Sequence, residues 1–161
     1  MTDIRRLKAR VVSPDDWRVW RTLRLEALAD AADAFESTLS DWASADERRW
    51  RQRLEEVPFN VMAIIGEDVV GQASGTNIGA DGRCELISMY VSRDARGAGA
   101  AEALAEAVCD WAAAAGATAV RLFVRRSNAR AIRLYDRVGF VPVDEPADDP
   151  AEIAMVRSLI P

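Results

Sequence analysis

Short apolar runs, which predict strands, alternate along the chain with longer stretches whose apolar residues have helical spacing. The predicted strands occupy residues 7–12, 61–65, 69–75, 85–91, 118–124, 140–143 and 153–159. The predicted helices occupy residues 13–29, 44–56, 100–115 and 128–139. Strands and helices are therefore interleaved, which indicates a protein of the α/β (α+β) class.

The order of these elements predicts how the strands pair. The three strands between residues 61 and 91 follow each other through short turns, so we expect an antiparallel meander. The helix at 100–115 then connects two strands as a crossover, and the strands at 85–91 and 118–124 should run parallel. The last two strands form a predicted closing hairpin, and its acidic linker, 144–150, is expected to be exposed.

One junction between a strand and a helix is unusual. After the strand at 85–91, a loop rich in small residues leads directly into the Ala-rich helix. Small side chains let a ligand reach the backbone, and the first turn of a helix offers N–H donors that have no intrahelical partner. Arg96 adds a positive charge, so the loop predicts a site for an anion such as a pyrophosphate.

Two common phosphate-binding loops fit this junction badly. A Walker loop ends in Gly-Lys-Ser/Thr, but the only lysine of the chain is Lys8. The dinucleotide-binding fingerprint needs a small residue three positions after Gly99, where the chain has the bulky and anionic Glu102. A small Rossmann-type oxidoreductase is therefore a disfavoured alternative.

A second motif follows the strand at 118–124. Ser127 or Asn128 can cap a short helix, and Gly139 can end it in the left-handed conformation. The run is Asn128-x-x-Ala131-x-x-Leu134-Tyr135-x-x-x-Gly139-Phe140.

The two motifs, in this order and at this separation, resemble those of the GNAT superfamily of acetyl-CoA-dependent N-acetyltransferases. The first is Arg96-x-x-Gly99-x-Ala101, the family's acetyl-CoA loop, and the second is the run that contains Tyr135. The likeness is specific between about residues 85 and 140. It implies a single GNAT domain, 1–161, with a mixed, mostly antiparallel sheet of about six to seven strands, a parallel splayed pair and flanking helices.

The resemblance also implies an activity and a binding site. The family transfers an acetyl group from acetyl-CoA to an amine, and we expect direct attack by a primary amine in a ternary complex. In the family the strand before the loop pairs its backbone with the pantetheine arm, and the loop binds the pyrophosphate through N–H groups. The residues in these places are Met89, Tyr90, Val91, Arg96, Gly97, Ala98, Gly99, Ala100, Ala101 and Asn128.

Tyr135 is the predicted catalytic acid, because a phenol is protonated at neutral pH and can donate to the departing thiolate. The alternative is that Tyr135 only packs on the inner face of its helix. Glu85 is the candidate base, since alternation along its strand places Glu85, Ile87 and Met89 on one face. If that face meets solvent, Glu85 is only a surface charge.

The acceptor pocket is the least defined part of the prediction. The connector at 34–40 occupies a region that often walls this pocket in the family, so Phe35 and Glu36 are predicted to bind the acceptor. The acceptor itself, a small molecule or a peptide amine, is not identified. Acidic groups such as Glu36 and Glu85 favour a cationic amine.

The composition excludes several classes of function and of binding partner. A net charge of −5 and a pI near 4.9 argue against a general nucleic-acid surface. The chain has no apolar stretch of about twenty residues and no apolar signal core near its start, so we expect a cytoplasmic protein with no membrane partner. With no histidine, a Ser-His-Asp hydrolase is excluded. Cys84 and Cys109 lack metal-like spacing, so we expect no metal and two buried thiols rather than acyl carriers.

Two further possibilities stay open at this point. A non-catalytic acyl-CoA-binding or sensing module would keep the loop without the chemistry, although Tyr135 argues against it. A homodimer is common in the superfamily, but no interface can be identified from the sequence.

Overall fold

The structure is a computed structural model that describes residues 6–30 and 38–160. Within these residues seven strands form one sheet in the order β1-β2-β3-β4-β5-β7-β6. The strands are β1 (Leu7–Val11), β2 (Phe59–Ile65), β3 (Asp68–Gly75), β4 (Arg83–Val91), β5 (Ala119–Arg125), β6 (Val141–Val143) and β7 (Glu152–Ser158). Only β4 and β5 run parallel, while every other neighbouring pair is antiparallel. The expected α/β class and the mixed sheet are therefore confirmed.

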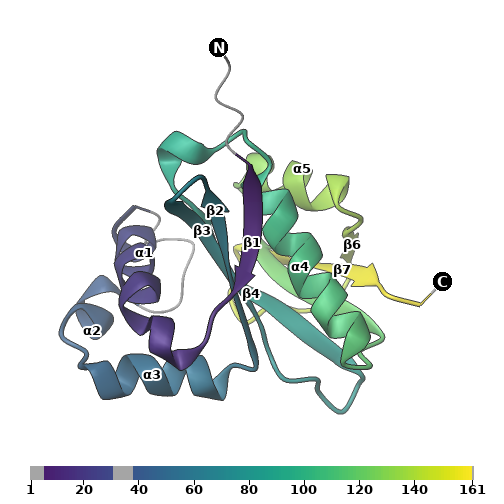
Figure 1. Ribbon diagram of the computed structural model, residues 1–161. Helices are drawn as coiled ribbons and strands as arrows, with labels where there is room; N and C mark the ends of the chain where they lie inside the picture. Colours follow the sequence, from purple (N-terminus) through teal and green to yellow (C-terminus); the bar gives the residue numbers. More distant parts are fainter. Residues whose placement is uncertain (1–5, 31–37, 161) are drawn as a thin grey trace.

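Helices cover both faces of this sheet (Figure 1). The chain forms α1 (Trp17–Asp30), α2 (Leu39–Ala43), α3 (Glu47–Glu56), α4 (Ala100–Ala114) and α5 (Ala129–Arg137), with short 3₁₀ turns at Pro14–Asp16 and Arg93–Ala95. Buried residues of α4, such as Leu104 and Val108, pack against Val61 and Ala73 of the sheet. Met62, the strand neighbour of Val61, points the other way and packs with Trp20 and Trp50 of α1 and α3.

The helix α2 was not predicted, and its cause is local. Thr38 and Asp41 form a capping box, in which the Asp41 N–H donates to Thr38 Oγ1 (3.3 Å) and the Thr38 N–H donates to Asp41 Oδ2 (3.2 Å). The next helix, expected from residue 44, begins only at Glu47, because Asp46 caps it by accepting from the Arg49 N–H (3.0 Å). The caps Thr38 and Asp46 therefore begin two separate helices, α2 and α3, where we expected a connector followed by a single helix.

The parallel pair separates soon after it begins. β4 pairs with β5 only over Arg83–Glu85 and Ala119–Arg121. Farther along, β4 pairs only with β3 and β5 pairs only with β7 among the described residues. The sheet therefore opens between its two halves at the carboxyl ends of β4 and β5.

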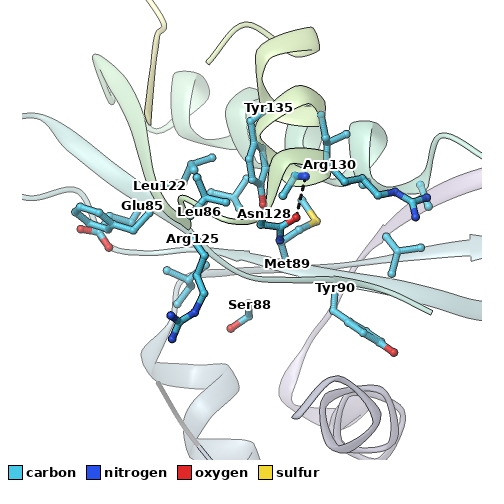
Figure 2. Close-up of a pocket in the computed structure, with 18 of the residues that line it drawn as sticks. Glu85, Leu86, Ser88, Met89, Tyr90, Leu122, Arg125, Asn128, Arg130 and Tyr135 are labelled. Atoms are coloured by element: carbon cyan, nitrogen blue, oxygen red, sulfur yellow. Dashed lines mark hydrogen bonds between the residues drawn. The ribbon is translucent and has the colours of Figure 1, made fainter. Parts of the chain in front are cut away.

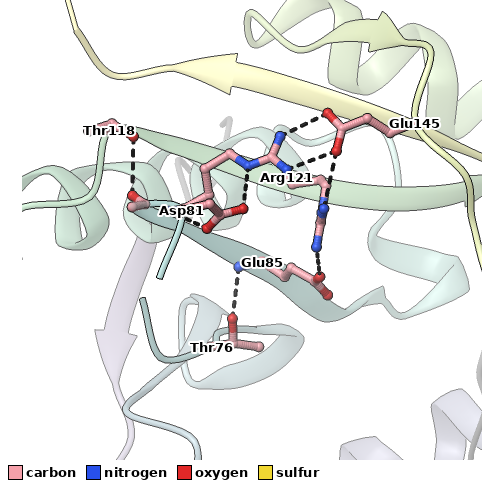
Figure 3. A network of polar contacts seen from close by, with 8 residues as sticks. Thr76, Asp81, Glu85, Thr118, Arg121 and Glu145 are labelled. Atoms are coloured by element: carbon pink, nitrogen blue, oxygen red, sulfur yellow. Dashed lines mark hydrogen bonds and ion pairs between the residues drawn. The ribbon is translucent and has the colours of Figure 1, made fainter. Parts of the chain in front are cut away.

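An ion network holds the closed end of this pair together (Figure 3). Both Nη atoms of Arg83 donate to the carboxylate of Glu145, at 2.8 Å each, and Arg121 Nη1 donates to it at 3.2 Å. The hydrogen bonds from Arg83 and Arg121 lower the pKa of Glu145 to about 2. The linker 144–150 was expected to be exposed, but Glu145 is half-buried, because the two guanidiniums bind it against β4 and β5.

No helix in the described part of the chain combines the length and apolar character needed to cross a bilayer.

Candidate active site

A cleft of about 1230 Å³ lies where the two halves of the sheet separate. β4 and β5 form its floor, the loop before α4 and the start of α5 line one end, and α1, α2 and α3 line the other. Of the ten residues predicted to bind the cofactor, all except Ala98 line this cleft. Tyr135 and Glu85 line it as well.

A bulge in β4 shapes the middle of the cleft. Tyr90 pairs with Gln72 and Ile87 pairs with Ser74, so that two residues, Ser88 and Met89, stand opposite one residue of β3. Ser88 has φ 58, the only positive φ outside glycine in the described chain. An extra residue of this kind bends a strand and turns its backbone away from the regular ladder, as often happens beside active sites. Ser88 could not be predicted as a site residue, because nothing in its type distinguishes it from an ordinary strand residue.

The bulge also overturns the alternation expected for β4. Leu86 lies on the α4 face before the bulge, and Met89 and Val91 pack on that same face after it. Met89 is therefore on the opposite face from Glu85, and the expectation that Glu85, Ile87 and Met89 share one face is wrong. The inserted residue shifts the two-residue period by one position.

The loop between β4 and α4 has the backbone that an anion site requires. Gly97 has φ 89 and Gly99, the N-cap of α4, has φ 88. An L side chain rarely adopts this conformation. Nothing lies within 4 Å of the place where a Cβ of Gly97 would be, so the loop is open to a ligand. Ala100 and Ala101, in the first turn of α4, line the cleft, and the N–H groups of a first helical turn have no intrahelical partner.

Arg96 supports the loop through several contacts. Its Nε donates to the carbonyl oxygen of Val91 (3.0 Å), and its Nη2 donates to Asp30 Oδ2 at the end of α1 (3.1 Å). Asp30 also accepts from the Tyr90 hydroxyl (3.1 Å) and from Arg93. Burial opposes ionisation of Asp30, but the Tyr90 hydrogen bond and the two arginines together lower its pKa. Arg96 thus joins the loop to α1, in addition to bringing positive charge to the cleft.

The second motif forms α5, and Figure 2 shows where its side chains lie. Asn128 caps the helix, since its Oδ1 accepts from the Ala131 N–H (3.1 Å). The Tyr135 ring is buried and packs edge-on against Phe140, with ring centroids 5.8 Å apart. Its hydroxyl points down into the cleft toward Asn128 and Met89 (Figure 2). Burial raises the pKa of Tyr135, so the phenol keeps its proton at neutral pH.

Glu85 lies at the closed end of the cleft, on the far side of Leu86 from Tyr135 (Figure 2). Its Oε1 accepts from Arg121 Nη2 (2.6 Å), and its side chain is about one third exposed. Glu85 therefore meets the cleft rather than bulk solvent, but Arg121 already occupies one of its oxygens.

The other predicted acceptor residues, Phe35 and Glu36, lie outside the described residues. At the end of the cleft formed by the first helices, the structure brings together residues of α1, α2 and α3 that no motif in the sequence singled out. They are Trp20, Arg24, Trp42, Trp50 and Arg53. The sequence pattern could have indicated Arg53. It stands three positions after Trp50 and next to Leu54, and so lies on the buried side of an otherwise charged helix. Arg130, exposed at the start of α5, also lines the cleft and was not predicted.

The two cysteine thiols lie outside the cleft. Cys84 and Cys109 are buried and free, as expected, and neither lines the cleft. Burial raises the pKa of both, that of Cys109 to about 11. A neutral buried thiol is a poor nucleophile.

A split parallel pair, a bulged strand and a glycine loop at a helix start are together the arrangement of a GNAT acyltransferase fold. The model of the acetyltransferase (GNAT) family matches residues 24–140, and the chain belongs to that family, whose members are acyltransferases. No curated protein matches the chain.

Solved structures agree on the fold. The PaiA N-acetyltransferase from Thermoplasma acidophilum, solved with coenzyme A, superposes with a TM-score of 0.75 at 16% identity, over 95% of this chain and 99% of that one. A GCN5-related N-acetyltransferase from Kribbella flavida gives 0.72 at 22% identity, over 95% and 98%. YncA from Salmonella typhimurium, a putative acetyltransferase solved with acetyl-CoA, gives 0.73 at 18% identity, over 97% and 95%. The mixed sheet they share with this chain excludes the Rossmann-type alternative.

Proposed function

We propose that the protein transfers the acetyl group of acetyl-CoA to a primary amine by direct attack within a ternary complex. The observation that carries the proposal is one continuous cleft, which joins the glycine loop, the bulged β4 and the Tyr135 hydroxyl. The structures of the PaiA protein with coenzyme A and of YncA with acetyl-CoA support the choice of donor.

The binding half of this proposal uses groups already in place. The pyrophosphate of acetyl-CoA would accept hydrogen bonds from N–H groups at Gly97–Ala101, where the helix dipole favours an anion. Arg130 lies at the same end of the cleft and supplies a further cation for the phosphates. The pantetheine would pair with the edge of β4 that β5 no longer covers, over Met89–Val91, much as an added strand does.

The chemical half begins when the neutral amine attacks the thioester carbonyl. A new N–C bond forms, and the tetrahedral oxyanion accepts hydrogen bonds from N–H groups at the β4 bulge. The C–S bond then breaks, and the thiolate takes the phenolic proton of Tyr135, which recovers a proton from solvent. The two protons of the acceptor nitrogen leave separately: the acceptor ammonium loses one through water before the attack, with Glu85 as the candidate acceptor, and the nitrogen of the tetrahedral intermediate loses the second to solvent. No covalent enzyme intermediate is needed, which agrees with the burial of both thiols away from the cleft.

Calorimetry with acetyl-CoA, and with ATP and NADH as controls, tests the binding half. A panel of amines with a thiol-release readout then tests transfer. We expect selective acetyl-CoA binding and CoA release with at least one class of amine. Binding without release on any amine would favour the sensing module and contradict the transfer. The cytoplasmic location and the homodimer stay predictions, which fractionation and sedimentation would test.

A further inference from the structure

The acceptor end of the cleft, defined here as the part lined by Trp20, Arg24, Trp42, Trp50 and Arg53, has unusual charge for a protein with net charge −5. Two guanidiniums lie there, one from α1 and one from α3. Burial lowers the pKa of Arg24 to about 10, and the like charge of Arg53 contributes in the same direction. Burial likewise lowers the pKa of Arg53 to about 10, and the negative charge of Glu56 opposes this shift only in part. Both groups are still positively charged at neutral pH.

The contacts of Arg53 are all neutral. Its Nη1 donates to Asn60 Oδ1 (3.0 Å), and its Nη2 donates to Ser74 Oγ (3.1 Å) and to Ser88 Oγ (3.2 Å). No carboxylate of the described residues forms an ion pair with it. A guanidinium has five N–H donors, so two are left for a ligand. A half-buried cation whose hydrogen-bond acceptors are all neutral is an environment in which a ligand carboxylate binds strongly.

A second donor in the same place lacks an acceptor. Trp50 is about 1% exposed, and its Nε1–H has no hydrogen-bond partner within the described ranges. Buried donors are normally satisfied, so an unsatisfied one that lines a cleft indicates a missing partner. Aromatic rings surround both donors. The Arg53 Cζ lies 5.5 Å from the ring centroid of Trp20, and the ring centroids of Trp42 and Trp50 are 4.7 Å apart.

We propose that the acceptor is a small amine that also carries a carboxylate, such as an apolar α-amino acid. Arg53 and the Trp50 Nε1–H bind the carboxylate, and the tryptophans contact the apolar part. Ser88 connects this site to the chemistry, because its hydroxyl accepts from Arg53 while its backbone forms the bulge of β4. The inference rests on the proposed transfer and narrows its acceptor. It adds a carboxylate to the cationic amine that Glu36 and Glu85 are expected to favour.

Matched acceptors test the proposal on the wild-type protein. An apolar amino acid is compared with its carboxamide and with the corresponding amine that lacks the carboxyl group, by thiol release. We expect kcat/KM to be about 10- to 100-fold higher for the carboxylate, the range for a charge-assisted hydrogen bond. The carboxamide's amine is the less basic and therefore less protonated, so intrinsic reactivity works against this result. Equal or better turnover of the carboxamide would overturn the proposal while leaving acetyl transfer intact.

Variants of α3 assign the preference to a residue. Arg53→Gln should remove most of the carboxylate preference, mainly through KM, and Arg53→Lys should restore part of it. Arg48→Gln is the matched control, because Arg48 lies on the same helix but is exposed. Unchanged acetyl-CoA affinity and melting temperature would show that Arg53→Gln is folded. A full carboxylate preference in a folded Arg53→Gln protein would contradict the role of Arg53.

A binding experiment separates this inference from the proposed transfer. An N-acetyl amino acid and its carboxamide, both analogues of the product, are titrated calorimetrically into protein loaded with CoA. If no amine releases thiol, the transfer fails, but tighter binding of the acid that depends on Arg53 would still support the carboxylate site. Equal binding of acid and amide, or binding of neither, would overturn it.

Discussion

At the residue scale, burial decides which side chains can act in the cleft. Tyr135 is buried apart from its place on the cleft wall, and its raised pKa keeps the proton that a thiolate needs. Tyr135→Phe should lower kcat by about ten- to thousand-fold, since it removes a general acid and keeps the ring that packs on Phe140. Steady-state kinetics and acetyl-CoA calorimetry check this, and the dissociation constant should barely change. Unchanged turnover would remove Tyr135 from the mechanism.

The pH dependence of kcat offers a second test of Tyr135. Because the pKa of the phenol is raised, the proton donor is intact throughout the neutral and mildly alkaline range. As pH rises, kcat should increase while the acceptor ammonium loses its proton, and it should not fall at any pH below about 10, the usual pKa of tyrosine. A fall in kcat below that pH that disappears in Tyr135→Phe would contradict the raised pKa.

Individual site residues could be predicted only where they belong to a sequence motif. Tyr135, Asn128 and the loop glycines stand in spaced patterns that can be recognised in one sequence. Ser88 and Trp50 do not, because their importance depends on a bulge and on the packing of α3 against the cleft. Such features arise from pairing between distant segments, which local spacing does not encode.

At the element scale, glycine variants distinguish backbone strain in the loop before α4 from loss of contact with the ligand. Gly97→Ala and Gly116→Ala both place a side chain at a positive φ, 89 at Gly97 and 94 at Gly116. At both positions nothing else lies within 4 Å of the added Cβ. Each should therefore lose about 1–2 kcal/mol of stability. Only Gly97→Ala should raise the acetyl-CoA dissociation constant, by about tenfold. Denaturant midpoints and calorimetry measure both effects, and equal affinity in the two variants would remove the loop from the binding site.

The ion network at the closed end of β4 and β5 predicts how stability depends on pH. An unfolded glutamate titrates near 4.5, whereas Glu145 titrates near 2 in the fold. The stabilisation is therefore complete above about pH 4.5 and is lost as pH falls toward 2, because the unfolded chain takes up the proton first.

Glu145→Gln tests this dependence by removing the titrating group. Its urea midpoint should lie below that of the wild type at pH 7, and the difference should shrink as pH decreases from 4.5 toward 2. A difference that stays constant over this range would mean that the Arg83 and Arg121 contacts do not depend on the charge of Glu145.

Most elements were predictable because each has a local signal. The strands and the long helices were confirmed to within a few residues, and the caps Asp46 and Asn128 explain where α3 and α5 begin. The division of residues 38–56 into α2 and α3 was missed, although both caps, Thr38 and Asp46, are legible in the sequence. The half-buried position of Glu145 was missed because its partners lie about sixty and twenty residues away.

At the scale of the whole molecule, the order of the elements predicted the parallel pair, and the family resemblance predicted its separation. Composition alone suggested an acidic protein, yet the cleft contains arginines from α1, α3, β5 and α5. Net charge is a sum over the surface, so it says little about a cleft in which positive side chains converge. The acceptor end therefore had to be found from the fold.

The most direct test of the account is mass spectrometry after incubation with isotopically labelled acetyl-CoA, with and without amine acceptors. We expect the label to appear on the acceptor nitrogen, with one CoA released per acetylated amine, and we expect no label on the protein at any time. Label bound to the protein before the acceptor is added, or no label on any amine, would contradict direct acetyl transfer in a ternary complex.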